Sequence, residues 1–274
     1  MYPIQPLLLR GAAAAGVLLV GCALAWVLDT RTLNGVSVWS KPMKFHLSFG
    51  LHLLTVAWLM RGMALAGLTR PATRLALRVL LFATLVELGY ITLQAARGRH
   101  SHFNFETPWE TVAYYGVMGG AALAAVFASA AIGWLLWRHP RDGLEPGIHL
   151  GAALGLMLGA LATLLTAGVL ATGAVAGSGH WVGGVHSDTN GLPLLGWSTS
   201  GGDLRVPHFF ATHLTQVLPL AGWLASGLSR PRAWVLASAL LGSGVVALTF
   251  AQALSGQPFV AGPAGFVAGQ GGRS

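Results

Sequence analysis

The chain has 274 residues, of which 54% are apolar and only 9% are charged, and its formal net charge is +8. A soluble protein of this length carries far more charge, so the composition indicates an integral membrane protein. The positively charged residues lie at the ends of the apolar runs, where they indicate membrane topology. The sequence has no basic patch with interleaved aromatic residues, so nucleic-acid binding is not indicated. The single cysteine, Cys22, excludes an intramolecular disulfide and a cysteine-rich metal or iron–sulfur site.

Seven apolar runs approach the length of ~20 residues that crosses a bilayer. They cover residues 8–28, 42–65, 75–96, 108–137, 148–176, 207–228 and 233–254. The pattern predicts an all-α, polytopic integral membrane protein with about seven transmembrane helices in one bundle at residues 1–255. A flexible tail rich in Gly and Pro is expected at residues 256–274.

The first apolar run contains Leu19-Val20-Gly21-Cys22, which resembles the cleavage box of a bacterial lipoprotein. Apolar residues continue to Leu28, beyond the ~7–15 residues of a signal-peptide core. We therefore interpret the run as the first transmembrane helix.

Lys and Arg residues set the expected orientation. With the N-terminus in the cytoplasm, nine of them lie in inner segments and seven in outer segments. The chain is expected in the cell inner (plasma) membrane, with a cytoplasmic N-terminus and an extracytoplasmic C-terminus. The outer loop at residues 177–206 is long and rich in glycine, which suits either a lid over the outer face or a solvated connector.

The most polar stretch of the chain, residues 97–108, lies between the third and fourth runs. From residue 100 onward two sets of residues alternate. One set is polar and consists of His100, His102, Asn104 and Glu106, and the other consists of Ser101, Phe103 and Phe105. Alternate residues of an extended segment point to opposite faces. The stretch is therefore predicted to be extended, with one polar face turned toward the bundle and one aromatic face.

Polar side chains fall on one face of each of four predicted helices, at 100° per residue. The four stripes are Lys41, Lys44, Ser48 and His52; Glu87, Tyr90, Gln94 and Arg97; Glu106, Glu110 and Tyr114; and His208, Thr212, Gln216 and Pro219, widened by His213. Ionisable groups inside a membrane usually face the protein interior and pair with one another. The stripes therefore predict a shared polar cavity, closed from outside by residues 97–108.

A charge network is expected above this cavity. Arg97 and Asp203 flank polar stripes, and Arg205 and Glu106 lie in the same outer layer. One network of these four groups would hold the outer loops in place.

Two kinds of cofactor suit these residues. Imidazole and carboxylate groups bind transition metals such as Cu, Fe or Zn, which makes His100, His102, Glu106 and His208 candidate ligands. Two membrane histidines, His52 and His213, are candidate axial ligands of haem b. The proposed cofactor-binding set is His52, His213, His208, Arg97, Lys44, Gln216 and Glu87, in which the cations pair with haem propionates and Glu87 lines a quinone pocket.

Three hypotheses about function follow. The first is a His-rich site at the extracytoplasmic side that binds a metal ion or haem for redox chemistry or metal handling. The second is a solute transporter or proton-coupled permease with a relay of Glu87, His52 and Lys44. The third is a structural or assembly subunit that works only with a membrane partner subunit. Taken singly, a membrane histidine is more often explained by a hydrogen bond to a neighbouring helix than by a function.

Overall fold

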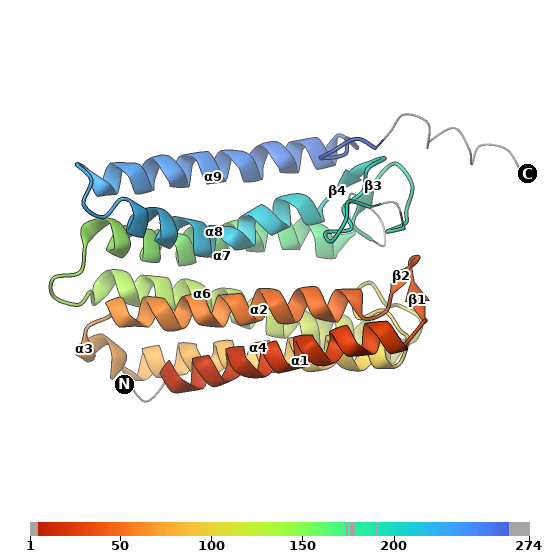
Figure 1. The fold of residues 1–274 in the computed structure, drawn as a ribbon, viewed down its shortest axis with the longest axis horizontal. Coiled ribbons are helices and arrows are strands. Elements are labelled where there is room, and N and C mark those ends of the chain that lie inside the picture. The colour runs from red at the N-terminus through yellow and green to blue at the C-terminus, as the bar shows by residue number, and fades with distance from the viewer. Residues whose placement is uncertain (1–4, 174, 176–178, 190, 263–274) are drawn as a thin grey trace, which may run out of the picture.

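A computed structural model of the chain describes residues 5–173, 175, 179–189 and 191–262. Long helices dominate it, in two layers (Figure 1). One layer holds α1 (Gln5–Leu28), α2 (Ser40–Leu59), α4 (Pro71–Ala96) and α6 (Gly119–Arg138), and the other holds α7 (Pro146–Thr172), α8 (Arg205–Leu224) and α9 (Pro231–Leu254). Contacts between α6 and α7, and between α2 and α8, join the layers. The predicted all-α class is confirmed.

Short elements connect these helices. After α2 the chain forms the 3-10 turn η1 (Met60–Gly62) and the single-turn helix α3 (Leu65–Leu68). Before α6 it forms α5 (Pro108–Val112) and the π-helical turn η2 (Ala113–Met118), so residues Pro108–Arg138 make one continuous helical segment. Two antiparallel strand pairs occur among the described residues, β1 (Thr32–Leu33) with β2 (Val36–Ser37), and β3 (Trp181–Val182) with β4 (Gly202–Asp203).

Five helical segments of the described chain are long and apolar enough to cross a membrane. They are α1, α4, the segment Pro108–Arg138, α7 and α9. Their outward faces expose large apolar side chains, for example Phe82 on α4 and Leu240, Leu241 and Leu248 on α9. Apolar surface on this scale is unfavourable in water and suits contact with lipid. These features indicate a membrane protein.

The other two predicted spans also form helices. Helices α2 and α8 have 20 residues each and match the predicted runs at 42–65 and 207–228, but they are less apolar than the other five. Helix α2 ends at Leu59, earlier than predicted, because the chain turns through η1 there. Helix α7 ends at Thr172 because Gly173 adopts a left-handed conformation (φ 65°), which terminates helices readily.

Small residues bring α7 and α8 into close contact. Gly147, Gly151, Gly155 and Gly159 repeat every four residues along the face of α7 that meets α8. A Cβ atom on Gly151 would overlap the backbone carbonyl of Leu218, and one on Gly222 would overlap the carbonyl of Gly147. Glycine permits this backbone approach, as in other packed membrane helices.

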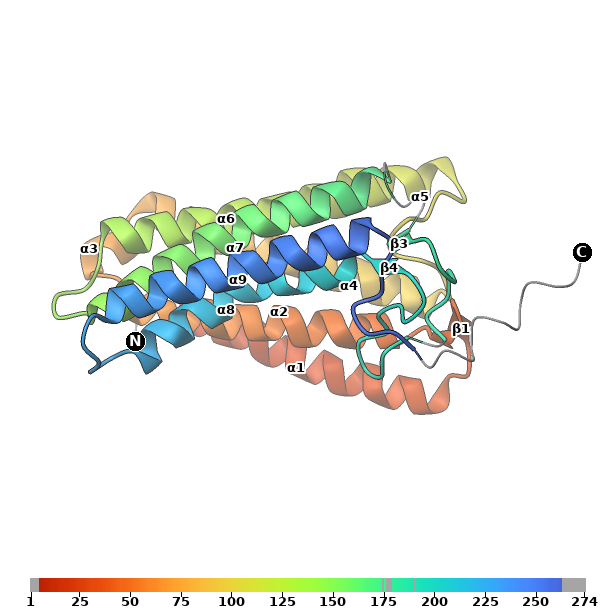
Figure 2. The same ribbon diagram turned by 90° about the horizontal axis from the view of Figure 1, so that it is seen from above.

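The loops predicted on the outer side lie together at one end of the bundle. Figures 1 and 2 place β1, β2, β3, β4 and α5 at this end. The Asp188 backbone N–H donates to the Asn34 carbonyl (3.2 Å), which joins the loop between α7 and α8 to the β1–β2 turn. Lys44 Nζ on α2 donates to the Leu195 carbonyl of the same loop (2.9 Å). We call this region the loop end. The last part of the predicted tail, residues 263–274, lies outside the described residues.

Candidate functional site

Residues 97–108 are folded back on themselves, so the prediction of an extended segment with alternating faces is wrong. Phe103 has φ 54°, a left-handed conformation that lies outside the β region of an extended segment. The Gln94 and Asn104 side-chain amides both donate to the His100 carbonyl, at 3.3 and 3.0 Å. These hydrogen bonds bury Ser101 and Asn104 and leave Phe105 and Glu106 exposed.

Glu110 anchors one charge cluster at the loop end. Its side chain is 3% exposed and accepts from Arg99 Nη1 at 2.7 Å. Arg97 Nη2 lies 3.9 Å from the same carboxylate, and Arg97 Nη1 donates to Gln94 Oε1 at 2.8 Å. Glu106 also pairs with Arg99 (3.2 Å), but from an exposed position. The cluster fastens the loop to the ends of α4 and α5.

A second charge cluster centres on Arg205 at the start of α8. Its guanidinium pairs with Asp203 (2.7 Å), whose side chain is fully buried, and with Asp188 (2.9 Å). Asp203 also accepts from the Ser198 backbone N–H at 2.9 Å. His180 Nε2 lies 3.7 Å from Asp188. The sequence predicted one network joining Arg97, Glu106, Asp203 and Arg205, whereas the structure forms two separate ones.

The His180–Asp188 pair gives a pH dependence with a definite sign. Burial is the main reason that the pKa of His180 lies below its usual 6.5, against the attraction of Asp188. Burial raises the pKa of Asp188, but His180 and Arg205 outweigh it, so that this pKa is lowered overall. A lowered pKa in the folded state means that the unfolded chain binds protons first, so stability falls as pH decreases.

We therefore expect the unfolding temperature to fall as pH drops below 6.5, through His180, and again below 3.8, through Asp188. Thermal unfolding followed across this pH range checks the prediction. The His180→Gln variant should lose the first of the two steps. An unfolding temperature that rises between neutral pH and pH 5 would contradict the assignment.

Glu87 is the ionisable group placed deepest within a candidate span. It lies on α4, is 3% exposed, and its Oε1 atom has no hydrogen-bond partner. Lys41, in the first turn of α2, is the charge that acts on it. Lys41 also interacts electrostatically with Asp188 and Arg205. Its ammonium lies 6.0 Å from the centre of the Phe45 ring and makes no direct ion pair in the described chain.

His102 packs against Phe45, the ring that Lys41 also approaches. Its ring lies 5.5 Å from Phe45 and 5.9 Å from Tyr114, which η2 turns toward the interior. Burial, together with the positive charge of Lys41 and the proximity of His208, holds the pKa of His102 well below its usual value. A neutral imidazole therefore lies near Lys41 at the loop end. We call Lys41, Glu87, His102 and His208 the loop-end site.

The helix histidines each donate one ring N–H to a neighbour. Ser129 on α6 gives its hydroxyl proton to the Ala125 carbonyl, so it accepts from His52 Nε2 (3.0 Å). Thr166 on α7 similarly accepts from His208 Nδ1 (3.2 Å). His213 Nδ1 donates to the Phe209 carbonyl of its own helix (2.7 Å).

Other predicted residues have local partners or remain exposed. Gln216 Oε1 accepts from the Thr215 hydroxyl on the same helix (2.8 Å). Lys44 and Ser48 on the α2 stripe are exposed, and Lys44 reaches the loop carbonyl of Leu195. The stripe of α2 therefore contributes mainly Lys41 and the half-buried His52 to the interior.

The predicted metal ligands are not assembled. Within the described ranges no three His, Cys, Asp or Glu side chains lie close enough to hold a metal ion. Glu106 is 56% exposed and pairs with Arg99, away from His208. His100, His102, Glu106 and His208 therefore do not form a common ligand set in this structure.

Sequence reasoning missed several groups that shape the loop end. His180, Ser129 and Thr166 contribute contacts that only the packing of separate segments creates. It also missed the aromatic cluster of Tyr114 with Phe103 and Phe105, at 5.6 and 5.8 Å. The sequence feature that could have predicted this cluster is the pair Phe103 and Phe105 placed shortly before Tyr114-Tyr115.

Comparisons with protein families, with curated proteins and with solved structures find no match to this chain.

Proposed function

We propose that all seven long helical segments cross the membrane, in one polytopic bundle. Helices α2 and α8 run alongside the five more apolar segments, and each has 20 residues (Figure 1). At 1.5 Å per residue this length reaches ~30 Å, the thickness of the hydrocarbon core. Their lower apolarity is compatible with a bilayer, because His52 on α2 and His208 on α8 form hydrogen bonds with neighbouring helices and so need not face lipid.

The proposed orientation in the inner membrane places the loop end outside and the N-terminus in the cytoplasm. The short-loop end carries Arg61, Arg70, Arg138, Arg141 and Arg232 among its cations. An excess of Lys and Arg in short loops marks the cytoplasmic side.

Cysteine labelling tests this topology. In a Cys22→Ser background, Glu106→Cys and Thr189→Cys should react with a membrane-impermeant maleimide from the outside, because both residues are exposed at the loop end. Asp142→Cys, in the short loop before α7, should react only after the membrane is opened. Labelling of Glu106→Cys and Thr189→Cys from opposite sides would contradict the seven-span arrangement.

For the function itself, we propose a proton-coupled permease whose loop-end site binds a small polar solute. The observation that carries the proposal is Glu87, a carboxyl group buried within a candidate span with an unpartnered oxygen. An ionisable group in that place is expensive and usually serves an ion or substrate path. Lys41 acts on Glu87 over a distance and has no direct ion pair of its own in the described residues. A solute with a charged group would complete the coordination of both.

The coupling would follow from the protonation of Glu87. When Glu87 is ionised, it attracts Lys41; when it takes up a proton, that attraction disappears and Lys41 is free to hold an anionic group of the solute. His102 and Arg205 both interact electrostatically with Lys41 at the loop end, which the proposed topology places outside. Solute and proton would therefore reach the site from the loop end.

Glu87→Gln is expected to reduce proton movement by a factor of about 10 or more, because the amide cannot exchange a proton. The measurement uses proteoliposomes that enclose the pH dye pyranine, challenged with a panel of small carboxylates and amines. The matched control is Glu106→Gln, which changes an exposed carboxylate at the same end. Proton movement by Glu87→Gln at the wild-type rate would refute the proposal.

A metal or haem site for redox chemistry is the second candidate, and one observation favours it. His52, His208 and His213 each donate one ring N–H to the protein, which is how ligating histidines are oriented. His52 lies on α2 and His213 on the adjacent α8. Lys44 and Arg97 would then pair with propionates, and a quinone would occupy the space near Glu87. A Soret band that disappears in both His52→Ala and His213→Ala would favour this candidate over transport.

The third candidate, a structural subunit, needs a membrane partner. Co-purification of a partner with a chain that shows neither flux nor absorbance would favour it.

A further inference from the structure

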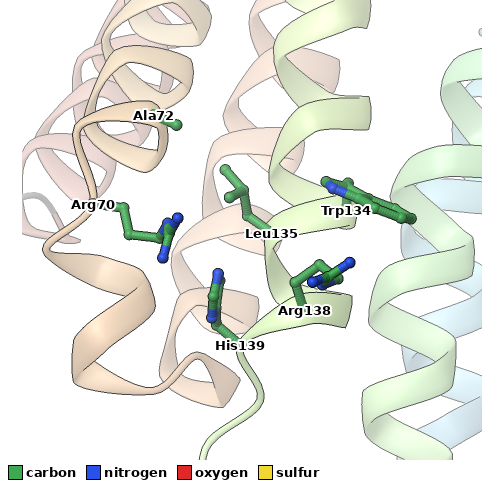
Figure 3. A pocket seen from close by; sticks show the side chains of 6 residues that line it. All are labelled: Arg70, Ala72, Trp134, Leu135, Arg138 and His139. Atoms are coloured by element: carbon green, nitrogen blue, oxygen red, sulfur yellow. The ribbon is translucent and has the colours of Figure 1, made fainter.

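A cationic cavity lies at the opposite end of the bundle from the loop-end site. Its volume is about 400 Å³, and it is lined by Arg70, Ala72, Trp134, Leu135, Arg138 and His139 (Figure 3). The Arg70 side chain extends from the start of α4 toward Leu135 and His139, while Arg138 and Trp134 project from α6. None of these six residues is acidic, so the lining of the cavity carries positive charge only.

Backbone contacts hold the walls of this cavity in place. The Ala64 backbone N–H donates to the His139 carbonyl (2.9 Å), and the Arg141 N–H donates to the Gly62 carbonyl (2.9 Å). A Cβ atom on Gly67 would collide with the His139 side chain, so α3 packs directly against that residue. The backbone on this side of the cavity is therefore held by two segments fastened to each other.

Residues in and around the lining indicate that the cavity opens at the boundary between lipid and water. Trp134 is 52% exposed, and the Arg138 guanidinium lies 5.7 Å from its ring. Leu65 on α3 and Leu75 on α4 are exposed apolar residues at the same end. An exposed tryptophan beside arginines, next to exposed leucines, is typical of the boundary between lipid tails and head groups. A soluble anion would make no use of the apolar part of this surface, whereas the acyl chains of a phospholipid would contact it.

We propose that the cavity binds the phosphate head group of an anionic phospholipid. Arg70 and Arg138 provide charge-assisted hydrogen bonds to phosphate oxygens, since guanidinium groups match phosphate geometry. Trp134 and Leu135 contact the glycerol and the start of the acyl chains. The inference concerns a site separate from the proposed solute site and does not depend on it.

The test measures lipid binding to the full-length protein in detergent micelles. Phosphatidylglycerol, phosphatidylcholine and inorganic phosphate are titrated, and bound lipid is counted by native mass spectrometry. Arg70→Gln/Arg138→Gln is expected to weaken phosphatidylglycerol binding by about 30-fold, because each basic residue near an anionic head group contributes a factor of about 5. The matched control, Arg230→Gln/Arg232→Gln, removes the same charge from two exposed residues at the start of α9. It should bind as the wild type does.

A second measurement does not depend on the folding of the double variant. Brominated phosphatidylglycerol should quench wild-type tryptophan fluorescence more than it quenches Trp134→Phe, whose substitution lies at an exposed position. Equal loss of binding in both double variants would overturn the proposal in favour of diffuse surface charge. Saturation by inorganic phosphate at the same concentration as the lipid, or equal binding of phosphatidylcholine, would overturn it as well.

Discussion

Asp203→Asn is expected to lower the free energy of unfolding by about 3 kcal/mol, because it leaves a largely buried cation short of its main partner. The Asp203 carboxylate is fully buried and holds Arg205, whose side chain is only 26% exposed, through hydrogen bonds of 2.7 to 3.1 Å. The expected value is at the low end for a broken buried pair, since Asp188 still attracts Arg205 at 2.9 Å. Equilibrium unfolding in mixed micelles measures the change.

Glu106→Gln is the control for this prediction. Glu106 also pairs with an arginine, at 3.2 Å, but its side chain is 56% exposed and that of Arg99 is 37% exposed. Solvent screens such a pair, so its loss should change stability by about 0–1 kcal/mol. Equal effects of the two substitutions would show that the Asp203 cluster does not hold the loops onto α8.

Gly151→Ala is expected to destabilise the bundle by about 1–3 kcal/mol, because the added methyl group has no space between α7 and α8. The atoms that it would meet belong to the backbone of Leu218 and Pro219, which cannot rotate away as a side chain would. The two helices would have to separate along their contact. The loop-end site should be disturbed as well, since His208 on α8 is positioned by Thr166 on α7.

Gly168→Ala provides the comparison on the same helix. A Cβ atom there meets nothing within 4 Å, so only the preference of alanine for helices remains. That preference stabilises by about 0.5–1 kcal/mol, and the two substitutions should therefore have opposite signs. Unfolding in mixed micelles measures both variants. A neutral Gly151→Ala would mean that α7 and α8 pack less closely than the structure indicates.

Local composition was sufficient to predict the helices. Apolar runs separated by Pro, Gly and charged residues located all seven long helical segments, because hydropathy and helix-ending residues act within a few turns. Predicted ends were less accurate where the cause is a single backbone angle, as at Gly173, where α7 ends four residues early. For Glu87 an energetic argument was sufficient. Exposing a carboxyl group to the hydrocarbon core is unfavourable, so Glu87 was expected to face the interior, and it is buried.

The loop before α5 shows where the pattern of residue types was misleading. Alternation of polar and aromatic residues matched a strand, but no strand in the described part of the chain pairs with the stretch. Hydrogen bonds from Gln94 and Asn104 to the His100 carbonyl bend it instead. Such bonds depend on which side chains come within reach, which a period of two residues does not encode.

The sequence by itself determined the class of the protein and the positions of its helices, since these depend on neighbouring residues. Only the tertiary structure decided the partners of the polar groups. It paired His52 with Ser129 and His208 with Thr166, divided the expected charge network into two, and left Glu87 with Lys41 as its electrostatic partner. The physical reason is that hydrogen bonds and ion pairs act over a few ångströms, so residues distant in the chain interact only after the helices have packed.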